Sequence, residues 1–431
     1  MSPAQTTKTY DAVIIGAGPG GLATIISLID GGLRNILWVD RSFGGGRLNE
    51  LYREISSNTK VGIYLDAIGS SSTCKKIIAS TPSPNAIDEL RSIDNEETCQ
   101  LSLAGDMIKL LEAGVVGIEG VENCVGEVKE ATYENARWNV VLPSSSNATT
   151  CRLFLCTGSH PIVPDPPIHK QYAPELRVLD LDQCMLKSRL PTLFADTLGQ
   201  SHVKPKKVVV AVIGNSHSGI LVCRNLYEVS QETKLDIKIL NFRRRGIKYA
   251  EYRDDGIVYD NTGLKGATAD WAKEVMDGPN PPPTIEQIDL GEDEDKVYRE
   301  RLNECTHIIY AIGYEANPYP ALYLNKNKEA KEGGLDNTAN ANGNTNENDH
   351  LDRDQDRLRV DKKLEFDQHT SGFKVDGEAV EGLFGLGIAH PEETEDPEGN
   401  VEAAVGLAKF FKFAQRVQDH WVKVGDKGRC R

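Results

Sequence analysis

The alternation of apolar and polar positions predicts a strand, a glycine-rich turn, a helix and a second strand at the beginning of the chain. The buried-strand pattern of residues 11–15 runs directly into Gly16-Ala-Gly-Pro-Gly-Gly21. An apolar series at helical spacing follows in residues 22–30, and a second apolar strand ends at Asp40. This order is typical of a βαβ unit.

The same order of patterns begins again at Lys206. The apolar run 208–213 leads into Gly214-Asn-Ser-His-Ser-Gly219, and a helical pattern and a strand ending at Phe242 follow. Two such units in one chain predict an α/β fold with two Rossmann-like dinucleotide-binding domains.

The segments outside the two units predict how the domains are divided. Residues 136–143 and 151–158 have strand patterns that we interpret as an antiparallel excursion returning to the first domain, and the proline-rich stretch 161–167 marks a stiff boundary. Residues 306–314 form another buried-strand pattern ending in glycine. The Asn-rich segment 325–357 has almost no large apolar side chains, so we expect a disordered loop.

The C-terminal part of the chain regains a regular pattern. Residues 364–377 predict a short hairpin, and residues 382–390 predict a strand that runs into a glycine turn. We expect the last helix to close the first domain, because apolar residues recur at helical spacing in the series Val401, Ala404, Val405, Ala408 and Phe411.

Composition and charge exclude several classes of protein. The 431 residues are 39% hydrophobic and 26% charged, as in soluble globular proteins, and the longest apolar stretches are too short to span a membrane. A net charge of −15 argues against nucleic acid as a partner. The nine cysteines contain no C-x-x-C pair, so we expect reduced thiols and no metal site. The N-terminus lacks the pattern of a secretory signal, and a cytoplasmic location is expected.

The first glycine turn has the spacing G-x-G-x-x-G, and each glycine has its own physical role. Gly16 permits the tight turn, Gly18 lets the backbone approach a pyrophosphate, and Gly21 lets the helix pack closely on the strand. Asp40 follows Gly16 by 24 residues, where an acidic side chain accepts hydrogen bonds from a ribose. The alternative is a glycine turn with a purely structural role.

In the second turn Ser216 replaces the middle glycine, so a hydroxyl is expected to contribute to phosphate binding. The cluster Arg243-Arg244-Arg245 follows the second strand, where an acid would otherwise meet the ribose. Arginines at that place bind a 2′-phosphate and favour NADPH over NADH, although an arginine run on a solvated face is the plainer interpretation.

The chain resembles the two-dinucleotide-binding flavoproteins, in which an N-terminal unit holds FAD and an inserted domain binds NAD(P)H. Residues 153–158 and 308–314 resemble the strands at which those chains cross between domains, and residues 382–390 resemble their flavin-contacting segment. Within that superfamily, residues 43–60 resemble the Gly-Gly and Asn-Thr stretch of flavin-containing monooxygenases. The disulfide reductase branch is disfavoured, because we expect neither of its redox spacings, C-x-x-C and C-x-x-x-x-C, and because Ile388 follows Gly387 where Asp is usual.

The resemblance implies roles for individual residues. Asn58 would lie beside the reactive edge of the flavin, and Asn400 would place the N-terminus of the last helix toward it. His390 and the Tyr-rich and Gly-rich segment 247–266 have both a structural and a functional interpretation, and His217 is expected only to start a helix. The expected FAD-binding residues are Gly16, Gly18, Gly21, Asp40, Arg41, Gly46, Arg47, Gly387 and Asn400, and those for NADPH are Gly214, Ser216, Ser218, Gly219, Arg243 and Arg244.

The fold implied is an FAD-binding domain from residues 1–165 and 305–431 with an NAD(P)H-binding domain, residues 190–304, inserted into it. The implied function is that of an NADPH-using monooxygenase that oxygenates a small nitrogen or sulfur compound through a C4a-hydroperoxyflavin. Two alternatives stay open: a flavin reductase or dehydrogenase that does not oxygenate, and a non-catalytic redox-sensing flavoprotein. The sequence leaves open whether the chain forms a homo-oligomer.

Overall fold

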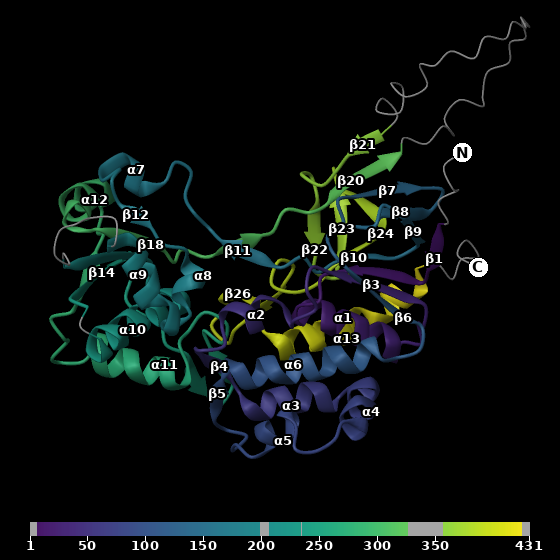
Figure 1. Ribbon diagram of the computed structural model, residues 1–431, viewed down its shortest axis with the longest axis horizontal. Coiled ribbons are helices and arrows are strands. Elements are labelled where there is room, and N and C mark those ends of the chain that lie inside the picture. Colours follow the sequence, from purple (N-terminus) through teal and green to yellow (C-terminus); the bar gives the residue numbers. More distant parts are fainter. Residues whose placement is uncertain (1–6, 199–206, 234, 326–356, 425–431) are drawn as a thin grey trace, which may run out of the picture.

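The computed structural model describes residues 7–198, 207–233, 235–325 and 357–424, which form two α/β domains lying side by side (Figure 1). The first domain is built on a parallel sheet, to which an antiparallel hairpin adds at one edge. In spatial order its strands are β22 (Glu365–Asp367), β23 (Gly372–Val375), β24 (Glu378–Gly385), β10 (Leu153–Leu155), β2 (Ala12–Ile15), β3 (Ile36–Asp40) and β6 (Val121–Val125).

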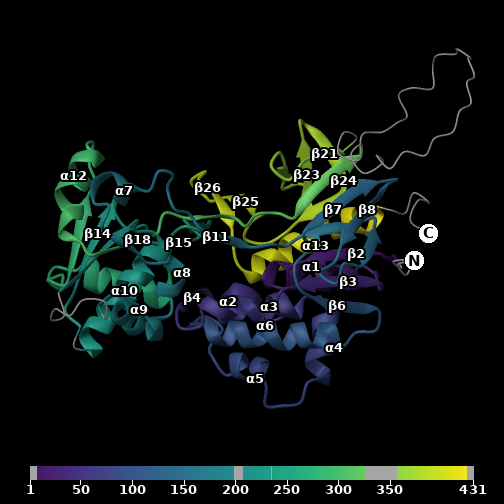
Figure 2. The same ribbon diagram turned by 45° about the horizontal axis from the view of Figure 1, so that its top comes forward.

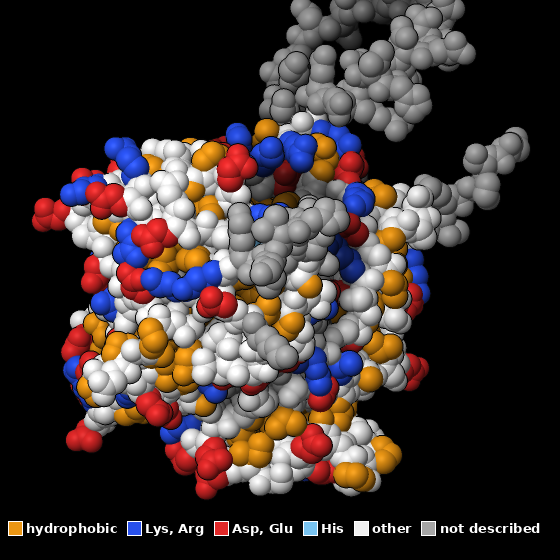
Figure 3. Space-filling view, turned by 60° about the vertical axis from the view of Figure 1, so that its left-hand side comes forward, with side chains coloured by type: hydrophobic (Ala, Val, Ile, Leu, Met, Phe, Trp, Pro, Cys, Tyr) orange, Lys and Arg blue, Asp and Glu red, His pale blue; other side chains and the backbone are white. Residues whose placement is uncertain are grey.

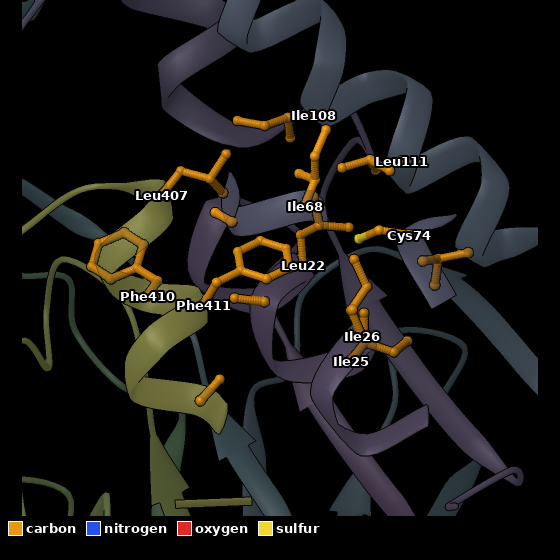
Figure 4. Packing of buried hydrophobic residues seen from close by; sticks show 14 of the residues in the cluster. Leu22, Ile25, Ile26, Ile68, Cys74, Ile108, Leu111, Leu407, Phe410 and Phe411 are labelled. Carbon is orange, nitrogen blue, oxygen red and sulfur yellow. The ribbon is translucent and has the colours of Figure 1, made fainter. Parts of the chain in front are cut away.

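Helices cover one face of this sheet and bury a large apolar cluster against it (Figure 4). The cluster joins Leu22, Ile25 and Ile26 of the first helix to Phe410 and Phe411 of the last. The helices of this domain are α1 (Pro19–Asp30), α2 (Gly46–Leu51), α3 (Val61–Gly69), α4 (Ser72–Ser80), α5 (Ala86–Arg91), α6 (Leu101–Val116) and α13 (Leu407–Lys423).

A second sheet covers the opposite face. Because successive side chains of a strand point to opposite faces, Ile14 of β2 packs on the helices while Val13 packs against Trp138 of this second sheet. In spatial order its strands are β1 (Lys8–Tyr10), β9 (Asn147–Thr150), β8 (Arg137–Val141), β7 (Glu130–Glu134), β20 (Ala321–Asn325) and β21 (Arg357–Arg359).

The second domain has its own parallel sheet, whose central strand β13 (Val208–Ile213) is buried at every position, as expected between two layers of helices. The other strands, in spatial order around it, are β12 (Arg177–Val178), β18 (His307–Tyr310), then β14 (Ile237–Arg243) and β17 (Ile285–Asp289). Its helices are α7 (Ile168–Tyr172), α8 (Leu181–Cys184), α9 (Leu190–Leu198), α10 (His217–Glu232), α11 (Gly266–Trp271) and α12 (Glu294–Arg301).

The chain crosses between the domains twice, and the two crossings pair with each other. Strands β11 (Ser159–Pro161) and β19 (Tyr314–Ala316) are antiparallel neighbours between the domains, as Figure 1 shows. The parallel sheet of the second domain includes β12 and β18, although both strands lie outside the range 190–304 expected for this domain. The prediction of two Rossmann-like domains, one inserted into the other, is confirmed.

One prediction about the C-terminal segment is wrong. Val401 to Ala404 are not helical but form strand β26 (Val401–Ala404), which pairs with β25 (Glu392–Glu395). This hairpin extends from the first domain toward the second (Figure 2). Helix α13 begins only at Leu407, after Gly406 with φ of +139°.

Most of the Asn-rich segment 325–357, expected to be disordered, lies outside the described residues. Within the described residues, no helix is both long enough and apolar enough to cross a membrane.

Candidate functional site

Both glycine turns lie at the C-terminal end of a central parallel strand and lead into a long helix. Gly16 follows β2 and precedes α1, and Gly214 follows β13 and precedes α10. In parallel α/β sheets, ligands bind at this end of the strands, next to the first helical N–H groups. Neither Gly18 nor Ser216, the N-cap residues, uses a side chain to cap its helix, so these N–H groups are left for another partner.

The first turn is closed around atoms that exclude any side chain. Gly16 has φ of +108°, and a Cβ there would lie 2.1 Å from the carbonyl oxygen of Cys156. Gly18 faces Gly46, the first residue of α2, and a Cβ on Gly46 would lie 2.7 Å from the Gly18 Cα. Gly20 in turn meets Gly387, where a Cβ on Gly20 would lie 2.7 Å from the Cα. The structure thus brings together the backbones of four of the glycines around the start of α1.

Asp40 lies at the end of β3, next to this turn, as predicted. Its Oδ2 accepts a hydrogen bond from the Ala17 backbone N–H at 2.7 Å, and its Oδ1 accepts from those of Ser42 and Phe43. The carboxylate therefore fixes the glycine turn and the following loop. Arg41 is exposed and pairs with Glu127 at 2.9 Å.

The second turn repeats the geometry of the first. Gly214 has φ of +110°, and a Cβ on Gly219 would lie 2.3 Å from the Gly214 carbonyl oxygen. His217 starts α10, as predicted, and burial lowers its pKa to about 4, so the imidazole is neutral near neutral pH. The hydroxyl of Ser216 is at an exposed position in front of the helix.

Two of the three clustered arginines are already paired with carboxylates. Arg243 binds Asp289 on β17 at 2.7 Å, and Arg244 binds Glu294 on α12 at 2.6 Å. Arg245 contributes its backbone carbonyl, which accepts a hydrogen bond from Asn215 of the glycine turn at 2.6 Å. Figure 3 shows acidic side chains beside the basic ones on this side of the molecule. An incoming phosphate would therefore share Arg243 and Arg244 with acidic groups.

Asn58 bridges the two domains. It lies on β4 (Ser56–Lys60), which pairs with β5 (Thr98–Gln100) in the first domain. Its Nδ2 donates to the Gly263 carbonyl at 3.3 Å, and its Oδ1 accepts from the Lys265 backbone N–H at 2.9 Å. The amide thereby holds the loop before α11, and one N–H and one lone pair are left for another group.

The segment 247–266, singled out for its tyrosines and glycines, docks on the first domain. It begins with the hairpin β15 (Glu251–Arg253) and β16 (Gly256–Val258). Although burial opposes it, hydrogen bonds from Lys265 and from Lys409 of α13 lower the pKa of Asp260, which stays ionised between the two ammonium groups. The backbone N–H of Asn261 donates to Glu402 on β26 at 2.8 Å.

Two other predicted positions are structural in their contacts. Asn400 is not at the start of the last helix, because strand β26 lies between them. It lies in the turn before β26, and its Nδ2 donates to both carboxylate oxygens of Asp396, at 3.0 and 2.9 Å. His390 is buried among Phe366, Phe373 and Tyr319, and burial lowers its pKa to about 4. A neutral imidazole in that setting is a packed core group.

The sequence reasoning missed a buried polar cluster between the domains. Asp182 of α8 is fully buried and pairs with Arg47 of α2. It also accepts hydrogen bonds from the hydroxyls of Tyr52, at 2.6 Å, and of Tyr314, at 3.0 Å. Arg47, Tyr52 and Tyr314 lie in segments with family motifs, 43–60 and 308–314, but Asp182 belongs to none of the motifs recognised in the sequence.

A second buried carboxylate, Glu112 of α6, holds the loop before α2. Its Oε2 accepts the Gly45 backbone N–H at 2.9 Å, and burial, with a further contribution from Asp40, raises its pKa to about 6. Since the pKa is higher in the folded chain than the ordinary 4.5, folding favours the protonated form.

We therefore expect the contribution of Glu112 to the free energy of unfolding to be largest below pH 4.5. It should fall by about 2 kcal/mol as the pH rises through about 6, because 1.36 kcal/mol corresponds to one pKa unit. In Glu112→Gln this fall should vanish. Urea unfolding of both proteins across this pH range measures the difference, and parallel curves for the two proteins would contradict it.

No protein-family model matches the chain. A curated relative, the monooxygenase AgnR1 of Paecilomyces divaricatus, is 34% identical over 427 residues, which cover 95% of this chain and 97% of that protein. The chain belongs to this family of monooxygenases. The resemblance to flavin-containing monooxygenases that the motifs indicate is thereby confirmed.

Solved structures agree with the fold of this monooxygenase family. A flavin monooxygenase from Stenotrophomonas maltophilia superposes with a TM-score of 0.54 at 15% identity, covering 96% of this chain and 99% of that one. The ornithine N-hydroxylase of Kutzneria sp. 744 superposes with a TM-score of 0.55 at 12% identity and the same coverage. At such identities the likeness shows the fold.

The sequence of this monooxygenase does contain one of the two redox spacings of disulfide reductases, C-x-x-x-x-C, so the expectation that neither spacing occurs is wrong. Cys151 and Cys156 are separated by four residues. Cys156 is a free thiol, and burial raises its pKa to about 12, whereas Cys151 is disulfide-bonded and so is not its partner. A protonated, buried thiol is a poor nucleophile, so these two residues do not form a redox dithiol.

Proposed function

We propose that this chain is an FAD-dependent monooxygenase that takes its electrons from NADPH and oxygenates a small nitrogen or sulfur compound. The observation that carries the proposal is the pair of closed glycine turns, one in each domain, in a member of a monooxygenase family. The flavin monooxygenase and the N-hydroxylase with the same fold support the flavin, and the latter is described with reduced FAD, NADP⁺ and L-ornithine.

The residues of the first turn fit FAD. The backbone contact of Gly18 with Gly46 forms a cradle that a Cβ on Gly46 would fill, and the uncapped N-terminus of α1 supplies N–H groups to a pyrophosphate. Asp40 offers its carboxylate to the ribose. The N-terminus of α13 begins at Gly406 without a side-chain cap and offers its positive end to a reduced flavin.

The residues of the second turn fit NADPH. Gly214 and the uncapped start of α10 receive the pyrophosphate, and Arg243 and Arg244 receive the 2′-phosphate by exchanging part of their bonding to Asp289 and Glu294. When bound, FAD would supply the chemistry of hydride acceptance and of dioxygen activation. The overall reaction consumes NADPH, a proton and O₂; one oxygen atom enters the substrate and the other leaves as water.

The role proposed for Asn58 is to offer its free N–H to the oxygen-reacting face of the flavin while its bonds to residues 263 and 265 keep the second domain in place. This hydrogen bond would protect the oxygenating species from breaking down before the substrate arrives. The loop that Asn58 holds also excludes water from the same place.

We expect Asn58→Ala to uncouple the reaction. NADPH oxidation should continue, while the product formed per NADPH should fall at least about tenfold, because the loss of one hydrogen bond of about 1.4 kcal/mol corresponds to a factor of ten. Hydrogen peroxide should rise in proportion. The matched control is Ser56→Ala on the same strand, which loses a 2.9 Å hydrogen bond to Thr268 of α11 but keeps the amide, and which should stay coupled. Equal uncoupling in both variants would contradict the role of Asn58.

The experiment that tests the function measures NADPH consumption, hydrogen peroxide and oxygenated product with a panel of amines, hydroxylamines and thioethers. The proposal expects at least one compound to raise product and lower peroxide together. If every compound left all reducing equivalents in hydrogen peroxide, a flavin reductase or oxidase function would replace it.

A further inference from the structure

The cluster around Asp182 connects three segments that are distant in sequence. Arg47 belongs to α2 of the first domain, Asp182 to α8 of the second, and Tyr314 to β19, where the chain returns from the second domain to the first. Tyr52, just after α2, contributes a second hydroxyl from the first domain. Figure 1 shows α2 and α8 facing each other across the boundary between the domains.

The cluster also joins the two glycine turns. At one end, Tyr314 lies close to Ser218, which belongs to the second turn. At the other end, Arg47 directly follows Gly46, whose backbone touches Gly18 of the first turn. The cluster centred on Asp182 therefore lies between the two expected phosphate sites.

Burial makes the contacts around Asp182 rigid. A fully buried carboxylate is tolerated only when charged or hydroxyl donors satisfy it, and Asp182 receives one guanidinium and two hydroxyls. Burial raises the pKa of both tyrosines, so the two hydroxyls stay protonated and remain donors. A rotation of one domain on the other would separate the carboxylate from Arg47 and Tyr52, its partners in the first domain.

We propose that Asp182 is a positioning residue that holds the NADPH-binding turn at a fixed place relative to the FAD-binding turn, so that hydride transfer needs no rotation of the domains. The inference rests on the proposed function. Asp182 is not itself an expected cofactor-binding residue and acts through Arg47, which is one, and through Tyr314. The docked segment 247–266 on the far side of Asn58 makes a second connection of the same kind.

The test compares Asp182→Asn with Asp106→Asn. Asp106 is a matched control, because its carboxylate pairs with Arg53, at 2.7 Å, within the first domain. In Asp182→Asn we expect the rate of flavin reduction by NADPH under anaerobic conditions to fall about 10-fold to 100-fold, as for a misplacement of about 1 Å. The affinity for FAD should stay within about twofold, and Asp106→Asn should reduce its flavin at the parent rate.

A second measurement does not depend on the loaded enzyme. In the full-length protein before cofactor is added, amide hydrogen exchange in α8 and β19 should be faster in Asp182→Asn than in Asp106→Asn, because the domains separate more often. If Asp182→Asn does not fold, Tyr314→Phe removes one donor without exposing a charge, and a smaller fall in reduction rate with the same exchange pattern is expected.

The outcomes separate this inference from the function beneath it. If the parent protein shows no reduction of bound flavin by NADPH, the proposed function fails. If the parent protein is reduced, and Asp182→Asn and Tyr314→Phe are reduced at the parent rate with unchanged exchange, the function stands and the positioning role is wrong.

Discussion

Replacing Gly46 with alanine is expected to abolish tight FAD binding. Gly46 has φ of +66°, which costs a residue with a Cβ about 1–2 kcal/mol, and that Cβ would lie 2.7 Å from the Gly18 Cα. The two backbones must separate, which opens the cradle proposed for the pyrophosphate. Together these effects should weaken FAD binding by about 100-fold or more, since each 1.4 kcal/mol is tenfold.

The matched control lies two residues earlier in the same glycine run. A Cβ on Gly44 would meet only the Ser42 hydroxyl, at 3.9 Å, so Gly44→Ala should bind FAD like the parent protein. Equilibrium titration of each apoprotein with FAD, followed by flavin fluorescence, gives the affinities. Thermal unfolding of the apoproteins shows whether Gly46→Ala still folds. A folded Gly46→Ala protein with parental affinity would show that FAD does not use this cradle.

The second large effect is expected at Arg244, in the selection of NADPH over NADH. Arg244→Ala removes a charge-assisted hydrogen bond to the 2′-phosphate, a contact of about 1.5–3 kcal/mol, so the KM for NADPH should rise about 10-fold to 100-fold. The KM for NADH should hardly change, because NADH has no 2′-phosphate.

Glu294→Gln should act in the opposite direction. Glu294 competes with the phosphate for Arg244, with which it makes bonds of 2.6 and 2.9 Å, and removing its charge should lower the KM for NADPH severalfold. Arg299→Ala deletes an exposed arginine of the same helix α12. It removes the same charge as Arg244→Ala and is the control for the effect of net charge in that variant. Steady-state kinetics with NADPH and with NADH give the KM values of each variant. An equal rise in KM for NADPH and NADH in Arg244→Ala would contradict recognition of the 2′-phosphate by Arg244.

The parts of the fold that the sequence predicts well are those specified by local patterns. The glycine turns can be predicted because Gly16 and Gly214 have positive φ, which favours glycine. The apolar strand pattern before each turn and the helical pattern after it show where the turn lies. Asp40 was found because its place depends only on the length of one βαβ unit.

The parts that the sequence missed depend on partners distant in the chain. The spacing of Val401, Ala404 and Val405 fits a helix equally well, and only pairing with β25 makes residues 401–404 a strand. Asp182 belongs to no motif, because its partners come from two other segments that meet only after both domains fold. The carboxylates facing Arg243 and Arg244 come likewise from β17 and α12, which the sequence does not place beside them.

The central claim is that one chain holds FAD in its first turn and delivers hydride to it from NADPH in its second. The most direct measurement is rapid mixing of the FAD-reconstituted protein with NADPH under anaerobic conditions, followed through the visible flavin absorbance. The account predicts complete bleaching in a single turnover, faster with NADPH than with NADH. Protein that takes up no FAD, or whose bound flavin stays oxidised with both nucleotides, would contradict it.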